Sequence, residues 1–310
     1  MKKTLSMLMA LCMIFALMTC TAVGAFAADD EIVTGSGTFT TKEAVERTIA
    51  WQECSNLAGK HEFYHSALEH RAELENIWVT EEPWTDTMSW TNNTQFMYGK
   101  EAVYDFYCGI ETEKANWLRQ SVASDEMGII EQTEDWEGAG LLWYHMLMSP
   151  VIEVAGDGQT AIGLWQSWGT VTQMGSAQWT CEDYTMAFAK QSDGEWRIWH
   201  LRTFVHFYSN RDNSWTEQNM ATQGTDGNQP AGVGVMVGSN EMDTLEDMQN
   251  PGTYNGQFFV GYDMYYVPIL LTIPEPYETW ADIEDSFAWG GLQPLLGNNA
   301  DHESVIANIS

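Results

Sequence analysis

The chain has 310 residues, of which 13 are Lys or Arg and 44 are Asp or Glu, so its formal net charge is −31 at pH 7. This charge argues against binding to nucleic acids or to anionic membrane surfaces, because both require a basic face on the protein. With 44% hydrophobic and 13% aromatic residues, the chain can build a substantial core. We therefore expect a globular protein without a nucleic-acid partner.

The first 27 residues have the three parts of a secretory signal. Lys2-Lys3 is a basic start, Leu5–Gly24 is apolar, and Ala25-Phe26-Ala27 fits the small-x-small cleavage rule. We expect cleavage after Ala27, export from a bacterial cell, and no membrane span in the mature chain. A lipidated Cys20 and an uncleaved anchor are the alternatives, although the Thr before Cys20 fits lipidation poorly.

Three cysteines remain after this signal, namely Cys54, Cys108 and Cys181. Their number is odd and they are far apart in sequence, so the spacing indicates neither a disulfide framework nor a zinc ribbon. One disulfide is an alternative to three buried thiols, which would suit a mildly reducing setting.

After a polar leader over residues 28–40, a helical pattern begins at Thr41. Thr41 is the expected N-cap, with Glu43 in the first turn. We expect a break at Gly59, after which the helix resumes. Its i+3 and i+4 spacings then place four side chains on one face: His61, Tyr64, His65 and Leu68.

The next part of the chain predicts two shorter elements. A strand is expected near Thr87–Trp90, and a helix over Glu101–Gly109 has Val103, Phe106 and Tyr107 on its inward face. Glu111–Gly140 is acidic and lacks a clear pattern, so we assign it no structure.

Four strands are expected between Leu141 and Tyr208. Their ranges are Val151–Val154, Thr160–Thr172, Trp179–Lys190 and Glu195–Phe207. The turns Gly156-Asp157-Gly158 and Ser192-Asp193-Gly194 supply the positive φ that tight hairpins need. Two hairpins in series predict an antiparallel meander.

Alternation along the last two of these strands predicts their faces. In the third strand, Tyr184, Met186 and Phe188 share a bulky face. In the fourth strand, the shared face is apolar at its start and polar toward its end: Trp196, Ile198, His200, Arg202, Phe204 and His206. This face either runs from core into a pocket or emerges into solvent.

The composition changes after Tyr208. Ser209–Asn240 is rich in Asn, Gln, Gly and Ser, which is typical of a linker or a long loop. Asn250–Leu271 regains apolar residues and predicts extended structure. Ile273–Tyr277 and Trp280–Trp289 are too aromatic for plain disorder. We expect them to pack on the body as a pocket lid or a dimer arm.

The turns and apolar positions of the meander resemble the SnoaL-like branch of the nuclear transport factor 2-like superfamily. The resemblance rests on Ser149–Val154, Gly156-Asp157-Gly158, Ala161 to Trp165, and Asp193–Ile198. It extends from about Thr41 to about Tyr208 and implies an α+β cone, in which a curved antiparallel sheet wraps around N-terminal helices. Members of this superfamily often form dimers or trimers, and the resemblance concerns fold more than function.

The resemblance also implies a hydrophobic or aromatic small-molecule ligand, and for the dehydratases and isomerases of this superfamily acid–base catalysis without a cofactor. Scytalone dehydratase and the bile-acid dehydratases carry a Tyr–Asp pair on an early helix and a His before the central strand. The matching positions here are Tyr64-His65 and His145. Because the Asp is replaced by His65, an Asp–His pair is not implied, but two histidines could share the proton transfer near neutral pH.

Five further residues are candidates for binding the substrate: Trp143, Trp165, Tyr184, His200 and Arg202. We expect His200 and Arg202 to face the same cavity as His145. For each candidate, the alternative is an ordinary hydrogen-bonded or apolar core residue. His61, His70 and His206 are expected to be structural or exposed.

His61-Glu62-Phe63-Tyr64-His65 also fits the H-E-x-x-H pattern of zinc hydrolases, with Glu62 as general base. The third ligand of the metzincin extension is missing, because His70 falls one residue early. Glu101 could supply a third ligand, or His145 could complete a non-proteolytic metal site. A zinc hydrolase and a non-catalytic binding or interaction module are therefore the alternatives to a dehydratase or isomerase that uses no metal and no cofactor.

Overall fold

The computed structural model describes residues 30–67, 69–93, 95–108, 123–124, 129–130, 142–173, 176–216, 251–255, 271 and 273–283. The predicted signal and most of the predicted linker lie outside these residues. The chain divides into two compact units, Met1–Ile49 and Ala50–Ser310, and each is described by itself. None of the described helices is long and apolar enough to cross a membrane.

In the first unit, the predicted polar leader is a β-hairpin. β1 (Glu31–Thr34) pairs antiparallel with β2 (Gly37–Thr40). A capping box then starts α2 (Thr41–Ala67), because the Thr40 amide donates to Glu43 Oε2 at 2.8 Å and the Glu43 amide donates to Thr40 Oγ1 at 3.3 Å. The N-cap is therefore Thr40, one residue before the predicted Thr41.

In the second unit, α2 continues through Gly59 without the predicted break. A glycine inside a helix costs only about 1 kcal/mol relative to alanine. The burial of Leu57, Ala58 and His61 on either side of it offsets this cost. The helix ends at Ala67, and α3 (His70–Ile77) follows after a short break.

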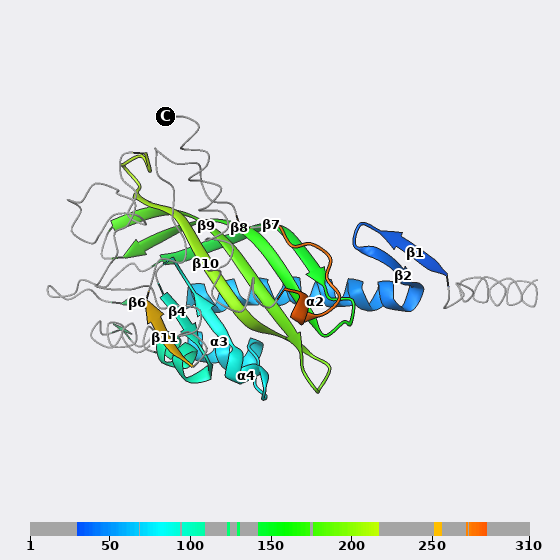
Figure 1. Cartoon of the computed structure of the whole chain (residues 1–310). Helices are drawn as coiled ribbons and strands as arrows, with labels where there is room; N and C mark the ends of the chain where they lie inside the picture. Colours follow the sequence, from blue (N-terminus) through cyan, green and yellow to red (C-terminus); the bar gives the residue numbers. More distant parts are fainter. Residues whose placement is uncertain are drawn as a thin grey trace, which may run out of the picture. The chain divides into compact units, whose positions relative to one another are not determined.

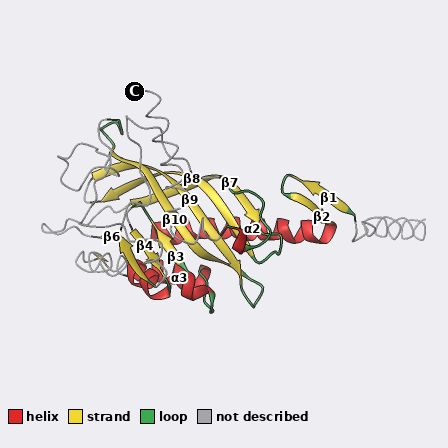
Figure 2. Ribbon diagram, viewed as in Figure 1, coloured by secondary structure: helices red, strands yellow, loops and turns green. Residues whose placement is uncertain are grey.

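The predicted meander is confirmed, with longer strands than expected. It comprises β7 (Leu142–Val154), β8 (Thr160–Gln173), β9 (Ser176–Lys190) and β10 (Trp196–Asn210), paired antiparallel in series. Figure 1 and Figure 2 show these four strands curving across α2. The arrangement is the predicted α+β type, a curved antiparallel sheet that is not closed into a barrel.

Three short strands extend this sheet to the order β11-β4-β3-β10-β9-β8-β7. They are β3 (Ser89–Thr91), β4 (Gln95–Tyr98) and β11 (Gly252–Asn255). The predicted helix near residue 101 is present over residues 100–108. The remaining elements are α4 (Trp84–Thr87), the ribbon of β5 (Ala123–Ser124) and β6 (Ile129–Ile130), and the single turn η2 (Trp280–Asp282).

The sheet has an inner face, which packs with residues of α2 and α3 in one core, and an outer face. Tyr184, Met186 and Phe188 are all buried in this core, as their alternation predicts. Trp165 lies directly opposite Tyr184 in the β8–β9 ladder, so it shares the inner face.

A β-bulge in β10 moves two predicted site residues to the outer face. Ile198 pairs with Phe188, but the next register pair is His200 with Ala187, so Trp199 is an extra residue. Arg202 then pairs with Thr185 and donates to its Oγ1 at 3.0 Å. The expectation that His200 and Arg202 face the same cavity as His145 is wrong, because one inserted residue inverts the alternation of the strand beyond it.

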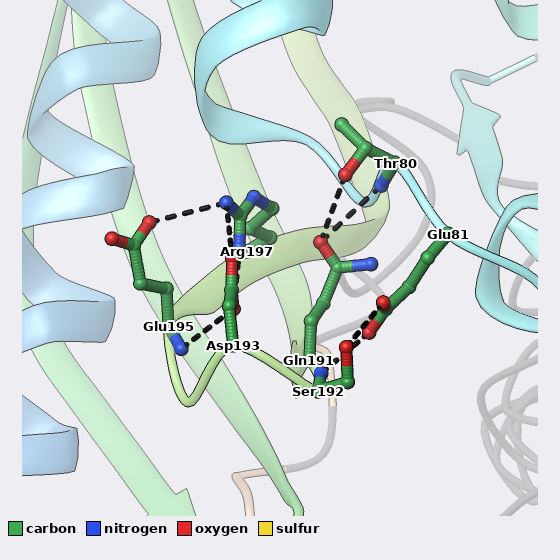
Figure 3. A network of polar contacts seen from close by, with 7 residues as sticks. All are labelled: Thr80, Glu81, Gln191, Ser192, Asp193, Glu195 and Arg197. Carbon is green, nitrogen blue, oxygen red and sulfur yellow. Dashed lines mark hydrogen bonds and ion pairs between the residues drawn. The ribbon is translucent and has the colours of Figure 1, made fainter.

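The turn between β9 and β10 is held to the segment that follows α3, as Figure 3 shows. The Thr80 amide and hydroxyl both donate to Gln191 Oε1 at 3.3 Å, and the Ser192 hydroxyl donates to Glu81 Oε2 at 2.7 Å. These contacts join residues more than 100 positions apart. They hold the segment after α3 against the turn that precedes β10.

The described part of the C-terminal tail contacts the outer face of the sheet. The amides of Gly156 and Asp157 donate to the carbonyl oxygens of Tyr277 and Glu278 at 2.9 and 3.0 Å. The ring of Trp280 stacks on His200 with centroids 5.4 Å apart. These tail residues therefore do not cover the face that carries His145, and a role as dimer arm stays a prediction.

Candidate active site

Four histidines and three glutamates gather between α2, α3 and the inner face of the sheet. We call them the His–Glu cluster: His61, Glu62, His65, His70, Glu73, His145 and Glu182. All except His65 are buried, and His65 is half-buried. Charged side chains are seldom buried unless they are paired or functional, so this concentration marks a candidate site.

The helices supply five members of the cluster. His61 and His65 are four residues apart on α2, so they lie on one face, with ring centroids 5.6 Å apart. The break after Ala67 lets α3 fold back, which brings His70 to 5.2 Å from His65, centroid to centroid. A single unbroken helix would have carried His70 away from this position.

The sheet supplies the other two members. His145 lies opposite Gly169 in the β7–β8 ladder, and Glu182 lies opposite Ser167 in the β8–β9 ladder. Glu182 is two residues from Tyr184 on β9, so both point to the inner face. Gly169 also lies opposite Thr180, two residues before Glu182, so His145 belongs to the same face. The ring of His145 is 5.6 Å from His65 and 6.4 Å from Tyr184, measured between centroids.

His61 and Glu73 form a tight buried pair, with His61 Nδ1 2.8 Å from Glu73 Oε1. The indole of Trp78 donates to the same oxygen at 2.8 Å. Burial disfavours the ionised form of Glu73, but the charge of His61 and these donors prevail and lower its pKa to about 2. Burial also disfavours protonated His61, yet Glu73 outweighs it and raises the His61 pKa.

His145 and Glu182 form a looser pair, with Nδ1 3.3 Å from Oε1 and without the alignment of a hydrogen bond. The hydroxyls of Thr180 and Tyr208 donate to the same carboxylate oxygen. Burial opposes both charges, but the mutual attraction prevails, so the pKa of Glu182 is lowered and that of His145 is raised. His145 is thus a buried histidine oriented and made more basic by a carboxylate.

Glu62 has no such partner. It is buried, and neither of its carboxyl oxygens has a hydrogen-bond partner among the described residues. Burial raises its pKa to about 7, against the opposing charges of His61 and His145. Glu62 therefore changes its protonation state near neutral pH, as acid–base catalysts do.

The structure brings together four of the predicted site residues: His65, His145, Trp143 and Tyr184. The ring of His65 lies 5.3 Å from that of Trp143, and His145 lies close to both His65 and Tyr184. Trp165 lies deeper in the core, 6.3 Å from Phe188 between centroids.

Three predicted residues are placed elsewhere. Tyr64 packs half-buried against the apolar core, and no hydrogen bond or ring contact within the described ranges joins it to the cluster. His200 and Arg202 are buried on the outer face. There burial, followed by the charge of Arg202, lowers the pKa of His200 well below the usual histidine range.

Five members of the cluster were absent from the predicted catalytic set: His61, Glu62, His70, Glu73 and Glu182. His61 and His70 were expected to be structural or exposed, and both are buried. Glu62 was considered only as the general base of a zinc motif. The alternation of β9 carries a signal for Glu182, since it shares the bulky face of Tyr184 and Met186. The contact of Glu73 with His61 bridges two helices and leaves no signal in local spacing.

The described part of the chain contains no group of three His, Cys, Asp or Glu side chains placed to hold a metal ion. His61 and His65 share a helix face, as H-E-x-x-H requires, but the described residues place no third ligand beside them. The zinc-hydrolase alternative therefore has no support within the described ranges. No disulfide joins Cys54, Cys108 and Cys181 to one another.

Residues 66–202 match the family model of the SnoaL-like domain. A search of curated proteins found no match. Among solved structures, hexachlorocyclohexane dehydrochlorinase LinA-type3 from Novosphingobium barchaimii is 11% identical, with 55% of this chain and 96% of that chain covered and a TM-score of 0.39.

Two further solved structures are similar, with sequence identities and TM-scores that are also low. An NTF2-like superfamily protein from Salmonella enterica serovar Typhimurium is 15% identical over 56% of this chain and 96% of its own, with a TM-score of 0.35. An NTF2-like protein with a cystatin-like fold from Novosphingobium aromaticivorans is 16% identical over 53% and 82%, with a TM-score of 0.34. Similarities this low say nothing about activity or substrate.

Proposed function

This chain carries a SnoaL-like domain, and we propose that the domain binds a hydrophobic or aromatic carbonyl compound at the His–Glu cluster and catalyses its dehydration or isomerisation. The protein acts after export, once residues 1–27 have been removed. SnoaL-like domains bind small molecules, and the aromatic rings around the cluster, such as Trp143 and Tyr184, suit an apolar ligand.

One observation carries the proposal, namely the buried pair of His145 and Glu182. Glu182 faces Nδ1 of the imidazole, which leaves Nε2 as the nitrogen that accepts a proton. A base of this kind removes a proton from the carbon next to a carbonyl group, and the electron pair moves onto the carbonyl oxygen. Dehydration and isomerisation both begin with this step.

The test uses the mature chain, residues 28–310, and two model substrates. One is a β-hydroxyketone with a phenyl group on the hydroxyl-bearing carbon, and the other is a β,γ-unsaturated ketone. Both give conjugated ketones whose absorbance can be followed directly. We expect turnover of at least one substrate by the wild type, and a loss of about 100-fold or more in His145→Ala.

The matched control is His206→Ala. His206 also pairs with a carboxylate, since its Nε2 lies 2.9 Å from Asp183 Oδ2, but Asp183 is on the opposite face of β9 from Glu182. We expect this variant to keep wild-type turnover. Turnover that survives His145→Ala would refute the catalytic assignment. Retention of an organic ligand in native mass spectrometry without any turnover would instead support a binding module.

A further inference from the structure

The ring of His61 is held in one orientation. Its Nδ1 faces Glu73 Oε1 at 2.8 Å, and Glu73 is itself fixed by the indole of Trp78. His70 Nδ1 lies 3.7 Å from the other carboxylate oxygen. Because Glu73 is an ionised acceptor, Nδ1 of His61 carries a hydrogen. Burial lowers the pKa of His61, but the charge of Glu73 outweighs it and raises this pKa, which favours the doubly protonated ring with a hydrogen on Nε2 as well.

The other nitrogen of His61 is buried without a partner. The residue is only 1% exposed, and Nε2 has no hydrogen-bond partner among the described residues. A buried N–H without an acceptor costs about 1–3 kcal/mol, more when the group is charged. The position is therefore suited to a molecule that brings an oxygen acceptor to Nε2.

His61 and His145 belong to the same buried cluster and are close enough for the charge of His145 to act on His61. His61 comes from α2 and His145 from β7, and the ring of Tyr184 lies 6.0 Å from that of His61 and 6.4 Å from that of His145, centroid to centroid. Proton removal next to a carbonyl needs a base at the carbon and a hydrogen-bond donor at the oxygen. We propose that His61 is this donor, a second catalytic residue whose Nε2–H binds the carbonyl oxygen of the ligand.

The inference rests on the proposed function and adds the group that His61 recognises. His145 Nε2 takes the proton from the carbon, and the C–H electron pair forms an enolate whose oxygen accepts from His61 Nε2. In dehydration, the enolate electrons expel the β-hydroxyl group, which takes the proton from His145 and leaves as water. In isomerisation, His145 returns the proton at another carbon. His61 keeps its proton throughout, and no oxidation or reduction occurs.

Two substitutions separate this role from a structural one. In His61→Asn, the amide nitrogen occupies the region of Nδ1, so the bond to Glu73 survives and the Nε2 donor is lost. In His61→Gln, the longer side chain carries an amide toward the Nε2 position and loses the bond to Glu73. A purely structural histidine would tolerate Asn and suffer from Gln. A ligand-binding histidine would lose binding in Asn and retain part of it in Gln.

The probe is para-nitrophenol, whose phenolate oxygen resembles that of an enolate and whose visible absorption reports ionisation. Binding is measured below pH 7, where Glu62 holds its proton. We expect the wild type to bind the probe as the phenolate, with affinity reduced at least tenfold in His61→Asn. We also expect the melting temperature of His61→Asn to stay close to that of the wild type. Wild-type affinity in His61→Asn, or no binding by the wild type, would overturn the proposal.

This measurement is independent of turnover. If neither model ketone is converted while phenolate binding still depends on His61, the proposed function fails and the donor site remains. If the ketones are converted and His61→Asn binds the phenolate normally, the proposed function stands and His61 is a structural residue.

Discussion

Gly169 lies directly opposite His145 in the β7–β8 ladder, where a side chain cannot be accommodated. A Cβ on Gly169 would lie 2.3 Å from the carbonyl oxygen of Tyr144 and 3.0 Å from Cα of His145. Both of these are backbone atoms, so β7 itself would have to move. The glycine therefore lets β7 approach β8 closely at the point where the proposed base is positioned.

We predict that Gly169→Ala displaces His145 and lowers turnover of the model ketones, together with a loss of about 1–3 kcal/mol in the free energy of unfolding. Gly59→Ala is the control, because nothing lies within 4 Å of a Cβ at this helical position. It should stabilise the protein by about 0.5–1 kcal/mol. Denaturant unfolding and turnover are measured for both variants. Full activity in Gly169→Ala would contradict the role given to this close approach.

Replacing Glu62 should stabilise the ligand-free protein at neutral and higher pH. Its pKa is raised from 4.5 to about 7, so the folded state binds more protons than the unfolded state between these values, and stability falls as pH rises across that window. Glu62→Gln removes the buried charge and should add up to about 3 kcal/mol above pH 7, but little below pH 4.5. Thermal unfolding across this pH range measures the difference, and an offset independent of pH would disprove it.

Glu73 should show the opposite pH dependence. Its pKa is lowered from 4.5 to about 2, so its stabilising contribution is complete above the unfolded value and is lost as pH falls through the folded value. Glu73→Gln leaves His61 without its carboxylate and should cost about 3 kcal/mol at neutral pH. The difference from the wild type should shrink between pH 4.5 and about 2 in acid-unfolding curves. A difference that persists at the acid end would mean that packing, rather than charge, is responsible.

Glu182 should control the pH dependence of turnover. His145 acts as a base only when neutral, and the charge of Glu182 raises its pKa. The wild-type kcat/KM should therefore rise with pH, with its midpoint above the usual histidine value. In Glu182→Gln, burial lowers the pKa of His145 against only the charge of Glu62, so the midpoint should move to lower pH while the maximum rate falls. The pH profile of kcat/KM for the β-hydroxyketone tests this, and a midpoint that does not move would exclude Glu182 as the partner.

The C-terminal tail should act as a brace rather than as a lid. Trp280 contacts Trp199 with centroids 4.5 Å apart and stacks on His200, both at the outer face. We predict that Trp280→Ala lowers the free energy of unfolding by about 1–3 kcal/mol, because a half-buried indole is removed. The affinity for para-nitrophenol should stay unchanged. A parallel loss of affinity would show that the tail contributes to the site.

Much of the fold was predictable because its signals are local. The positive φ values of Gly158 and Gly194 occur in the two predicted hairpin turns, and the bulky face of β9 follows from strict alternation. The residues that form a tight turn, and the alternation of side chains along a strand, depend only on neighbouring positions in the chain. Both can therefore be predicted from the sequence. Alternation also placed Tyr184 on the bulky face of its strand, whereas His145 was suggested by the family resemblance.

The composition of the site was decided by tertiary structure. Trp199 is an extra residue in β10, which pairs with β9 on one side and with β3 on the other, and this single residue sends His200 and Arg202 to the outer face. The break after Ala67, rather than at Gly59, turns α3 back so that Glu73 reaches His61. A buried charge is stabilised by whichever partner the packing brings to it, and those partners lie on other elements. Local patterns therefore predict the strands, the turns and the inner face of β9, whereas the packing of distant elements establishes which histidines and glutamates meet.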